Sequence, residues 1–234
     1  EGPSYMTNVV VKPNEVEGLY YQEGIDLTNH DANFLRKWAM TTPLPLPLGN
    51  EAYLAQQPKP DHYLDSISAE RGGFINLTRK FGGNKERKVI WLKTKIMAKE
   101  AVKTKLQLGF SDEVWVFLNN QMVFVDKNLF QQPAMRKYPE GRMSKDNASF
   151  GINLKQGENE LMIAIANDFY GWGFVARLES TEGINSVDEI GAILKVAKEI
   201  STINLEPYLG TYSSASLPIK LTFSKKEKTL LAKT

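Results

Sequence analysis

The stretch VWVFLNNQMVFV, residues 114–125, determines the expected fold. Strand-forming residues lie on both sides of Asn119 and Asn120. Asparagine adopts the positive φ angles of a tight hairpin turn more readily than other residues that carry a side chain. We therefore predict two antiparallel strands, 114–118 and 121–125, joined by a two-residue turn.

Apolar and polar residues alternate on both sides of this hairpin, over most of the first 180 residues. Two strands are expected before it, at 89–96 and 102–108. After it, the run 161–166 is apolar on both faces, which is typical of a strand buried on both sides. Gly, Pro and Asn separate these runs, so the prediction is an all-β fold, a β-sandwich of antiparallel strands. From the first strand, the residues expected to face its interior are Ile90, Leu92, Thr94 and Ile96.

The two ends of the chain follow different patterns. Prolines alternate with leucines at 43–48, which favours an extended edge or a loop. Ser186 and Glu189 have the spacing of a capping box, and an amphipathic helix is expected from Ile190 to about Ser201. Strands at 217–223 and 229–232 follow.

We therefore expect three parts. They are a sandwich at 1–182, a linking helix at 183–203 and a β-hairpin at 204–234. This hairpin either docks on the sandwich or begins a second domain.

Composition excludes several classes of function. The chain of 234 residues is 42% hydrophobic and 24% charged, as in a folded globular protein, and it contains no cysteine and two histidines. Disulfides, thiol catalysis and cysteine zinc sites are therefore excluded, and histidine metal centres are disfavoured. A net charge of +2 disfavours a generally basic nucleic-acid binder. The longest apolar runs fall short of the ~18 residues that cross a bilayer, and the sequence starts without a secretory leader, which is either absent or already removed.

Three segments resemble the galactose-binding-domain-like jelly roll. They are LQLGFSDEVWVFLNN at 106–120, LKQGENEL at 154–161 and GWGF at 171–174. This superfamily includes the sugar-binding domain of family 2 glycoside hydrolases and many carbohydrate-binding modules. The resemblance covers roughly residues 86–180, with Asn120 in place of the usual turn glycine. It implies a jelly-roll β-sandwich and a tendency to bind sugars through loops at one end, but no catalytic activity.

Four residues around the last of these segments are candidates for a sugar site. Trp172 and Tyr170 offer aromatic faces for a pyranose ring, and Asn167 and Asp168 offer groups for its hydroxyls. The alternative is that Trp172 closes the end of the sandwich.

A second candidate surface is basic. Trp91, Lys93 and Lys95 share one face of the strand at 89–96, where they would hold an acidic polysaccharide or a nucleic-acid backbone. The alternative is a solvated sheet face, or an edge strand that lysines protect from pairing.

These observations predict a non-catalytic carbohydrate-binding or accessory module of a larger extracytoplasmic protein, periplasmic or secreted. Its expected partners are a carbohydrate and a neighbouring domain, without nucleic acid or a membrane span. Two alternatives remain open, a spacer or docking domain without a ligand and a glycan hydrolase with two unplaced carboxylates. No catalytic residue and no cofactor are expected. A structural calcium would suit the fold, although no calcium-loop motif places one.

Overall fold

The computed structural model describes residues 31–83, 86–168, 170–201, 206–214, 217–226 and 229–233. One sheet contains the strands β1 (Lys37–Met40), β2 (Leu44–Pro45), β3 (Asp65–Ser68), β5 (Lys88–Ala98), β7 (Asp112–Leu118), β8 (Gln121–Asn128), β10 (Gly157–Ala166) and β12 (Ile184–Ser186). A smaller sheet contains β4 (Phe74–Asn76), β6 (Val102–Phe110), β9 (Ala148–Leu154) and β11 (Gly173–Leu178). The α-helices are α1 (Leu77–Phe81) and α2 (Gly191–Ser201).

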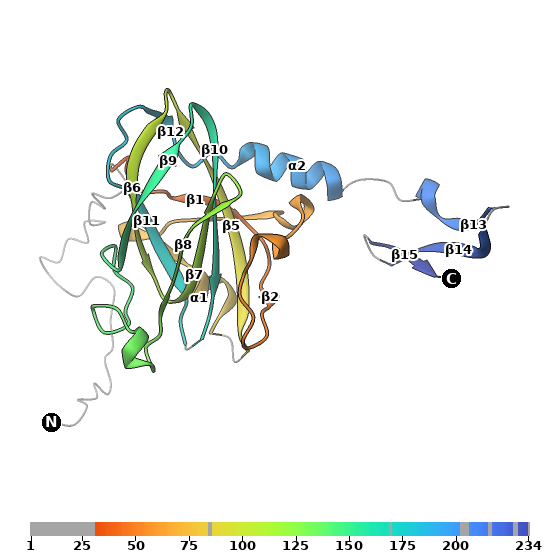
Figure 1. Ribbon diagram of the computed structural model, residues 1–234, viewed down its shortest axis with the longest axis horizontal. Helices are drawn as coiled ribbons and strands as arrows, with labels where there is room; N and C mark the ends of the chain where they lie inside the picture. Colours follow the sequence, from red (N-terminus) through yellow and green to blue (C-terminus); the bar gives the residue numbers. More distant parts are fainter. Residues whose placement is uncertain are drawn as a thin grey trace, which may run out of the picture.

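These two sheets form a sandwich (Figure 1). The strand order is β3-β1-β5-β10-β7-β8 in the larger sheet, where β2 and β12 also pair with β5, and β4-β11-β6-β9 in the smaller sheet. All these pairs are antiparallel. The predicted all-β sandwich is therefore confirmed.

The interior between the sheets follows the predicted alternation. On β5, the side chains of Ile90, Leu92 and Ile96 are fully buried and belong to the core cluster. Leu106 and Leu108 of β6 face them from the smaller sheet and are also fully buried. Each such side chain contributes roughly 1.5–3 kcal/mol when it leaves water, so this shared interior is the main source of stability.

The hairpin of β7 and β8 has the predicted turn. Asn119 and Asn120 have φ angles of 49° and 64°, between β7 and β8. The Asn119 side chain also accepts a hydrogen bond from the Glu160 backbone N–H at 3.0 Å and donates one to Asn159 Oδ1 at 2.9 Å. The turn is therefore fastened to β10, the next strand of the sheet.

The larger sheet has a second apolar layer on its outer face. Here Trp91, Trp115 and Phe117 form a cluster with residues of the segment 44–63 and with Ile193 of α2. The predicted extended edge at 43–48 contributes β2 and the buried Leu46. As predicted, β10 is buried on both faces, because it lies in the middle of the sheet between these two layers.

The C-terminal part differs from its prediction at one point. The helix α2 begins at Gly191, and Ser186 ends strand β12, so the predicted capping box is wrong. Asp188 lies between them with a φ of 64° and accepts a hydrogen bond from the Arg36 backbone N–H at 2.7 Å. This contact ties the segment between β12 and α2 to the residue that precedes β1.

Beyond the helix, three strands form a sheet of their own in the order β13-β14-β15. They are β13 (Gly210–Ser214), β14 (Leu217–Lys226) and β15 (Thr229–Lys233). Both predicted C-terminal strands are thus confirmed, and β13 was not predicted. The division of the chain into three parts stays a prediction.

Candidate functional site

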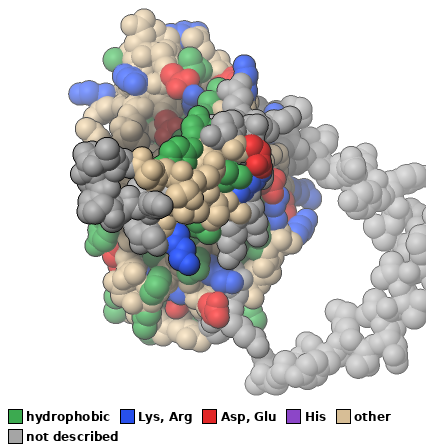
Figure 2. All heavy atoms as spheres, turned by 90° about the vertical axis from the view of Figure 1, so that its right-hand side faces the viewer, with side chains coloured by type: hydrophobic (Ala, Val, Ile, Leu, Met, Phe, Trp, Pro, Cys, Tyr) green, Lys and Arg blue, Asp and Glu red, His purple; other side chains and the backbone are tan. Residues whose placement is uncertain are grey.

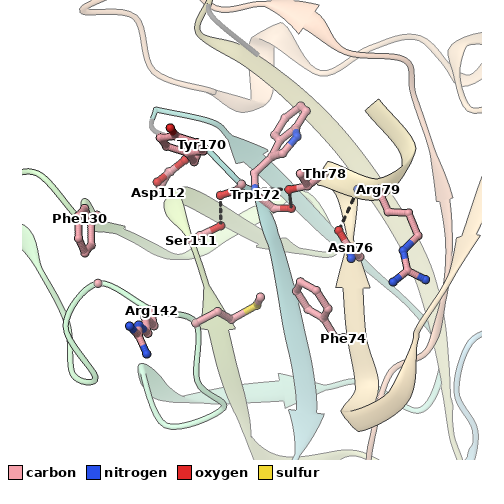
Figure 3. A pocket seen from close by; sticks show the side chains of 13 residues that line it. Phe74, Asn76, Thr78, Arg79, Ser111, Asp112, Phe130, Arg142, Tyr170 and Trp172 are labelled. Carbon is pink, nitrogen blue, oxygen red and sulfur yellow. Dashed lines mark hydrogen bonds between the residues drawn. The ribbon is translucent and has the colours of Figure 1, made fainter. Parts of the chain in front are cut away.

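A pocket of about 700 Å³ lies on the outer face of the smaller sheet. It lies beside β4, the helix α1 and the start of β11, and the loop between β8 and β9 forms its opposite wall (Figure 3). Its lining residues are Phe74, Asn76, Thr78, Arg79, Ser111, Asp112, Phe130, Gly141, Arg142, Met143, Tyr170, Gly171 and Trp172.

Two asparagines hold the loop that forms this wall. Asn128 is fully buried, and its side chain donates to the carbonyls of Phe110 at 2.8 Å and Arg142 at 3.3 Å. Asn147 donates to the same Arg142 carbonyl at 3.2 Å, and its oxygen accepts from the backbone N–H groups of Phe110 and Ser144. The backbone of Arg142 is therefore fixed from two sides, because both amides bond to it and to β6.

A glycine lets this loop lie directly on the sheet. Gly109 of β6 faces outward, and a Cβ at this position would collide with the Ser144 carbonyl. Any larger residue would push the loop away from β6 and open the pocket.

Several apolar side chains line the pocket, and two of them are solvent-exposed. Tyr170 is 77% exposed and Phe130 is 45% exposed, and they come from two separate segments, the one before β11 and the loop between β8 and β9 (Figure 3). Tyr170 has a φ of 62°, a conformation that residues with a Cβ adopt at a cost. An exposed aromatic ring at the edge of a pocket is a surface on which a sugar ring can stack.

Trp172 differs from its predicted role as an exposed stacking surface. Its side chain is 1% exposed, its indole N–H donates to the Gly82 carbonyl at 3.1 Å, and its ring contacts Phe81. It lines the pocket from within the core, so the alternative interpretation, that it closes this end of the sandwich, is correct. Of the two aromatic residues 170 and 172, Tyr170 is the one that reaches solvent.

The hydroxyls at the base of the pocket brace the start of β11. Thr78 Oγ1 donates to the Trp172 carbonyl at 3.2 Å and accepts from the Trp172 N–H at 2.8 Å. Ser111 Oγ donates to the Gly171 carbonyl and accepts from the Gly173 N–H, both at 3.2 Å (Figure 3). These hydrogen bonds give the base of the pocket a fixed shape.

The charged side chains that line the pocket differ in their burial and in their partners. Asp112 is 2% exposed, and its Oδ2 accepts from the Asp168 backbone N–H at 2.7 Å. Arg79 forms an ion pair with Glu70 at 3.2 Å. Arg142 is exposed, and its guanidinium has no ion pair within the described part of the chain. Arg142 therefore has its donors available to a ligand.

Asn167 and Asp168 do not line the pocket. Asn167 is 1% exposed, accepts from the Lys88 N–H at 2.8 Å and donates to the Glu86 carbonyl at 3.3 Å. Its amide holds the end of β10 against the start of β5, which favours a structural role, and its contact with a sugar stays a prediction. Asp168 is exposed next to the pocket, and its backbone N–H is bound by Asp112.

The predicted basic surface of β5 is covered. Trp91 is 1% exposed and stacks on Phe117 at a centroid distance of 5.7 Å, so it cannot serve as a stacking platform. Lys93 lies 3.0 Å from Glu160, and its ammonium also lies over the Tyr63 ring at 4.8 Å. These side chains face away from the interior, but Trp91 and Lys93 are not exposed, because the layer of residues 44–63 covers them.

Acidic residues neutralise what remains of this basic surface. Lys95 lies 2.8 Å from Glu158, so the alternating lysines of β5 pair with the alternating glutamates of β10. On the face shown in Figure 2, basic and acidic side chains are interspersed. The glutamates at 158 and 160 are the sequence signal for this pairing, and the sequence interpretation missed it.

Two findings concern metals and membranes. The described ranges contain no group of three or more histidine, aspartate or glutamate side chains that could hold a metal ion. His62 lies 3.3 Å from Asp61, and His30 lies outside the described residues. The structural calcium stays a prediction. None of the helices in the described ranges is long and apolar enough to cross a membrane.

Comparison with known proteins finds no matching family model and no matching curated protein. Among solved structures, a β-glucosidase from Kluyveromyces marxianus in complex with glucose matches 70% of this chain, with 14% identity and a TM-score of 0.37. The chain spans 17% of that enzyme.

Two smaller proteins match over most of their own length. A family 35 carbohydrate binding module from Clostridium thermocellum matches 63% of this chain and 96% of its own, with 9% identity and a TM-score of 0.31. The epithelial adhesin 9 A domain from Candida glabrata, in complex with Galb1-3GlcNAc, matches 68% of this chain and 88% of its own. The identity is 10% and the TM-score is 0.34. At these TM-scores the similarities say nothing about what this chain binds.

Proposed function

We propose that the chain is a non-catalytic carbohydrate-binding module and that the pocket on the smaller sheet is its sugar site. The observation that carries this proposal is the combination of exposed aromatic rings, Tyr170 and Phe130, with the available guanidinium of Arg142 in one pocket of about 700 Å³. Small-molecule sites are typically concave, mostly apolar and supplied with a few oriented polar groups.

The chemistry of each group suits a sugar. The C–H faces of a pyranose ring pack on aromatic faces, while hydroxyls at its edge accept hydrogen bonds from the guanidinium fork of Arg142. Asn128 and Asn147 fix the backbone that carries Arg142. A site that is held in place before the ligand arrives loses less conformational entropy on binding, which favours affinity.

The acidic residues favour binding over glycoside hydrolysis. Most glycosidases use two carboxyl groups on either side of the scissile bond. Among the described residues that line this pocket, Asp112 carries the one carboxylate. It is buried and accepts a hydrogen bond from the Asp168 backbone, which favours a structural role.

Calorimetric titration with a panel of mono- and oligosaccharides tests the proposal. We expect binding by the native chain and a loss of about tenfold in affinity, close to 1.4 kcal/mol, in Tyr170→Ala. Tyr138→Ala is the matched control, because Tyr138 is 86% exposed and does not line the pocket. Absence of binding to every sugar in the panel, or equal losses in both variants, would contradict the proposal.

The second candidate function is a spacer or docking domain of a larger extracytoplasmic protein. One observation favours it: all four tryptophans, Trp38, Trp91, Trp115 and Trp172, are at most 1% exposed. A surface without exposed tryptophan suits a domain that only holds its neighbours in place. The same titration separates the two functions, because a spacer would bind no sugar, and the pocket would then be a by-product of loop packing.

A further inference from the structure

A second hollow of about 280 Å³ adjoins the proposed sugar site. It is lined by Phe34, Gly72, Phe74, Met143, Ser144, Lys145 and Val175. Phe74 and Met143 line both hollows. These two side chains therefore form a common wall between the two spaces.

Three segments of the chain run from the first hollow to the second, and each contributes lining residues to both. Near β4, Asn76 lines the first hollow, Phe74 lines both hollows and Gly72 lines the second hollow. In the loop after β8, the same succession is Arg142, Met143 and Ser144.

The third segment is β11 together with the residue before it. Trp172 lines the first hollow and Val175 the second. Three residues of an extended strand span about 10 Å, which is longer than one pyranose ring. The two hollows therefore follow one another along the direction of β11.

We propose that the two hollows are consecutive subsites for a linear, uncharged glycan, whose chain crosses Phe74 and Met143. This inference rests on the proposed function, and it adds that the ligand is an extended chain and not a single terminal sugar. The apolar side chains of Phe74 and Met143 would contact the C–H groups around the linkage between two sugar units.

The charges around the two hollows favour an uncharged ligand. Arg79 is paired with Glu70 at 3.2 Å, and Lys145 is paired with Asp146 at 3.1 Å. The remaining charged lining residues, Arg142 and Asp112, have opposite signs. Because the charges of the described lining residues balance, we expect hydrogen bonds and apolar contacts to supply the affinity, and added salt should change it little.

Phe34 forms the wall of the second hollow that lies away from the first hollow, and its ring is held by close packing. The Phe34 ring packs on Gly73, where a Cβ would collide with it. The guanidinium carbons of Arg36 and Arg177 lie 5.6 and 5.7 Å from the centre of the same ring. Phe34 is 7% exposed and is thus held in one orientation, as a fixed part of the wall of the second hollow.

The test measures affinity against chain length. The probes are size series of cello-, xylo-, manno- and galacto-oligosaccharides, each from the monosaccharide to the hexasaccharide. In the series that binds, we expect the tetrasaccharide to bind at least about tenfold more tightly than the monosaccharide, because the second subsite is occupied by a chain that is already attached.

Ser144→Phe tests which hollow supplies this gain. Ser144 lines the second hollow, so a phenyl ring at this position should fill it and leave the first hollow open. We expect the variant to bind the monosaccharide as the native chain does and to lose the tenfold advantage of the longer ligand. Ser149→Phe, the same change on the exposed part of β9, is the matched control and should keep the advantage.

The possible outcomes separate this inference from the proposed function. Equal affinity for all lengths, or a tenfold advantage that survives in Ser144→Phe, overturns the two-subsite inference and leaves the sugar site standing. Absence of binding in all four series overturns both. Circular dichroism and thermal unfolding of each variant verify that the fold is intact, and a misfolded Ser144→Phe is replaced by Val175→Phe, whose side chain lines the same hollow.

Discussion

The outer face of the larger sheet is covered by other parts of the chain, whereas the outer face of the smaller sheet carries two hollows. On the larger sheet, bulky outward residues such as Trp91, Trp115 and Phe117 are covered by the segment 44–63 and α2. On the smaller sheet, the outward positions near the pocket hold Gly109 and Gly173, and the covering loop leaves two hollows. Large outward side chains on the larger sheet form a second core. On the smaller sheet, the glycines let the loop and β4 lie close to the strands, and the two hollows lie beside these contacts. Substitutions on the two faces should therefore act on different properties.

The largest expected effect comes from the covered face. Trp91→Ala removes a 1% exposed indole that stacks on Phe117, and we expect the free energy of unfolding to fall by about 3–5 kcal/mol. Urea denaturation followed by circular dichroism measures it. Tyr170→Ala, on the open face, is the control and should change stability by less than about 0.5 kcal/mol. Similar losses in both variants would remove the distinction between the faces.

A buried ion pair fastens the covering segment to the larger sheet. Arg87 lies 2.6 Å from Glu113 and also donates to the carbonyls of Pro47 at 3.0 Å and Asn50 at 2.8 Å. Glu113→Gln leaves the Arg87 cation without its carboxylate, and we expect a loss of about 2–4 kcal/mol in denaturant unfolding. Glu179→Gln removes the acid of the exposed pair with Lys105, so it is the matched control and should cost under about 0.5 kcal/mol.

The same ion pair predicts how stability depends on pH. Burial raises the pKa of Glu113, but hydrogen bonds from Arg87 and Lys127 outweigh it and hold this pKa below its ordinary value. Its contribution is therefore fully present above the pKa of the unfolded chain, and it is lost as the pH falls through the lowered pKa of the folded state. The unfolding free energy of Glu113→Gln should fall less steeply in that acid range. Parallel pH profiles of the two proteins would contradict this assignment.

A smaller loss of stability is expected on the open face, at the residue that holds its loop. Asn128→Ala removes hydrogen bonds to Phe110, Arg142 and Lys137, and we expect about 1–3 kcal/mol of destabilisation together with weaker sugar binding. Thermal unfolding and calorimetric titration measure the two effects. Asn153→Ala, at an exposed position of β9, should affect neither. Unchanged affinity in Asn128→Ala would show that a fixed loop is unnecessary for binding.

The smallest effect on stability should accompany a clear effect on binding. Arg142→Gln changes an exposed side chain without an ion pair in the described ranges, so unfolding should shift by less than about 0.5 kcal/mol. Sugar affinity should fall about tenfold, because the amide has fewer donors than the guanidinium. Calorimetric titration checks this, with Arg71→Gln, at an exposed arginine outside both hollows, as the control. Full affinity in Arg142→Gln would remove this residue from the site.

The sequence was informative where alternation decides the structure. The inward positions of β5 and the Asn119-Asn120 turn could be predicted, because strand periodicity and positive φ angles are local properties. Exposure of the opposite face could not be predicted in the same way, since Trp91 and Lys93 are covered by a segment more than twenty-five residues away. The pattern shows which side of a strand a residue takes, but not what packs against that side.

The candidate site shows the same limit. The sequence drew attention to the segment around Trp172, and this segment does border the pocket, but Tyr170 and not Trp172 is its exposed ring. Phe130 and Arg142 were missed, because they belong to a long loop without a regular pattern. Two asparagines with no recognisable motif, Asn128 and Asn147, bring that loop to the sheet.

The burial of every indole ring has an optical consequence. Of the four tryptophans, Trp172 alone lines the pocket, and it does so from the core side. Emission from the folded chain should be that of shielded chromophores, poorly quenched by acrylamide. A sugar in the pocket would change the surroundings of one emitter in four. Under the proposed function, we expect Trp172 fluorescence to report occupancy of the pocket, and Trp172→Phe should remove this response.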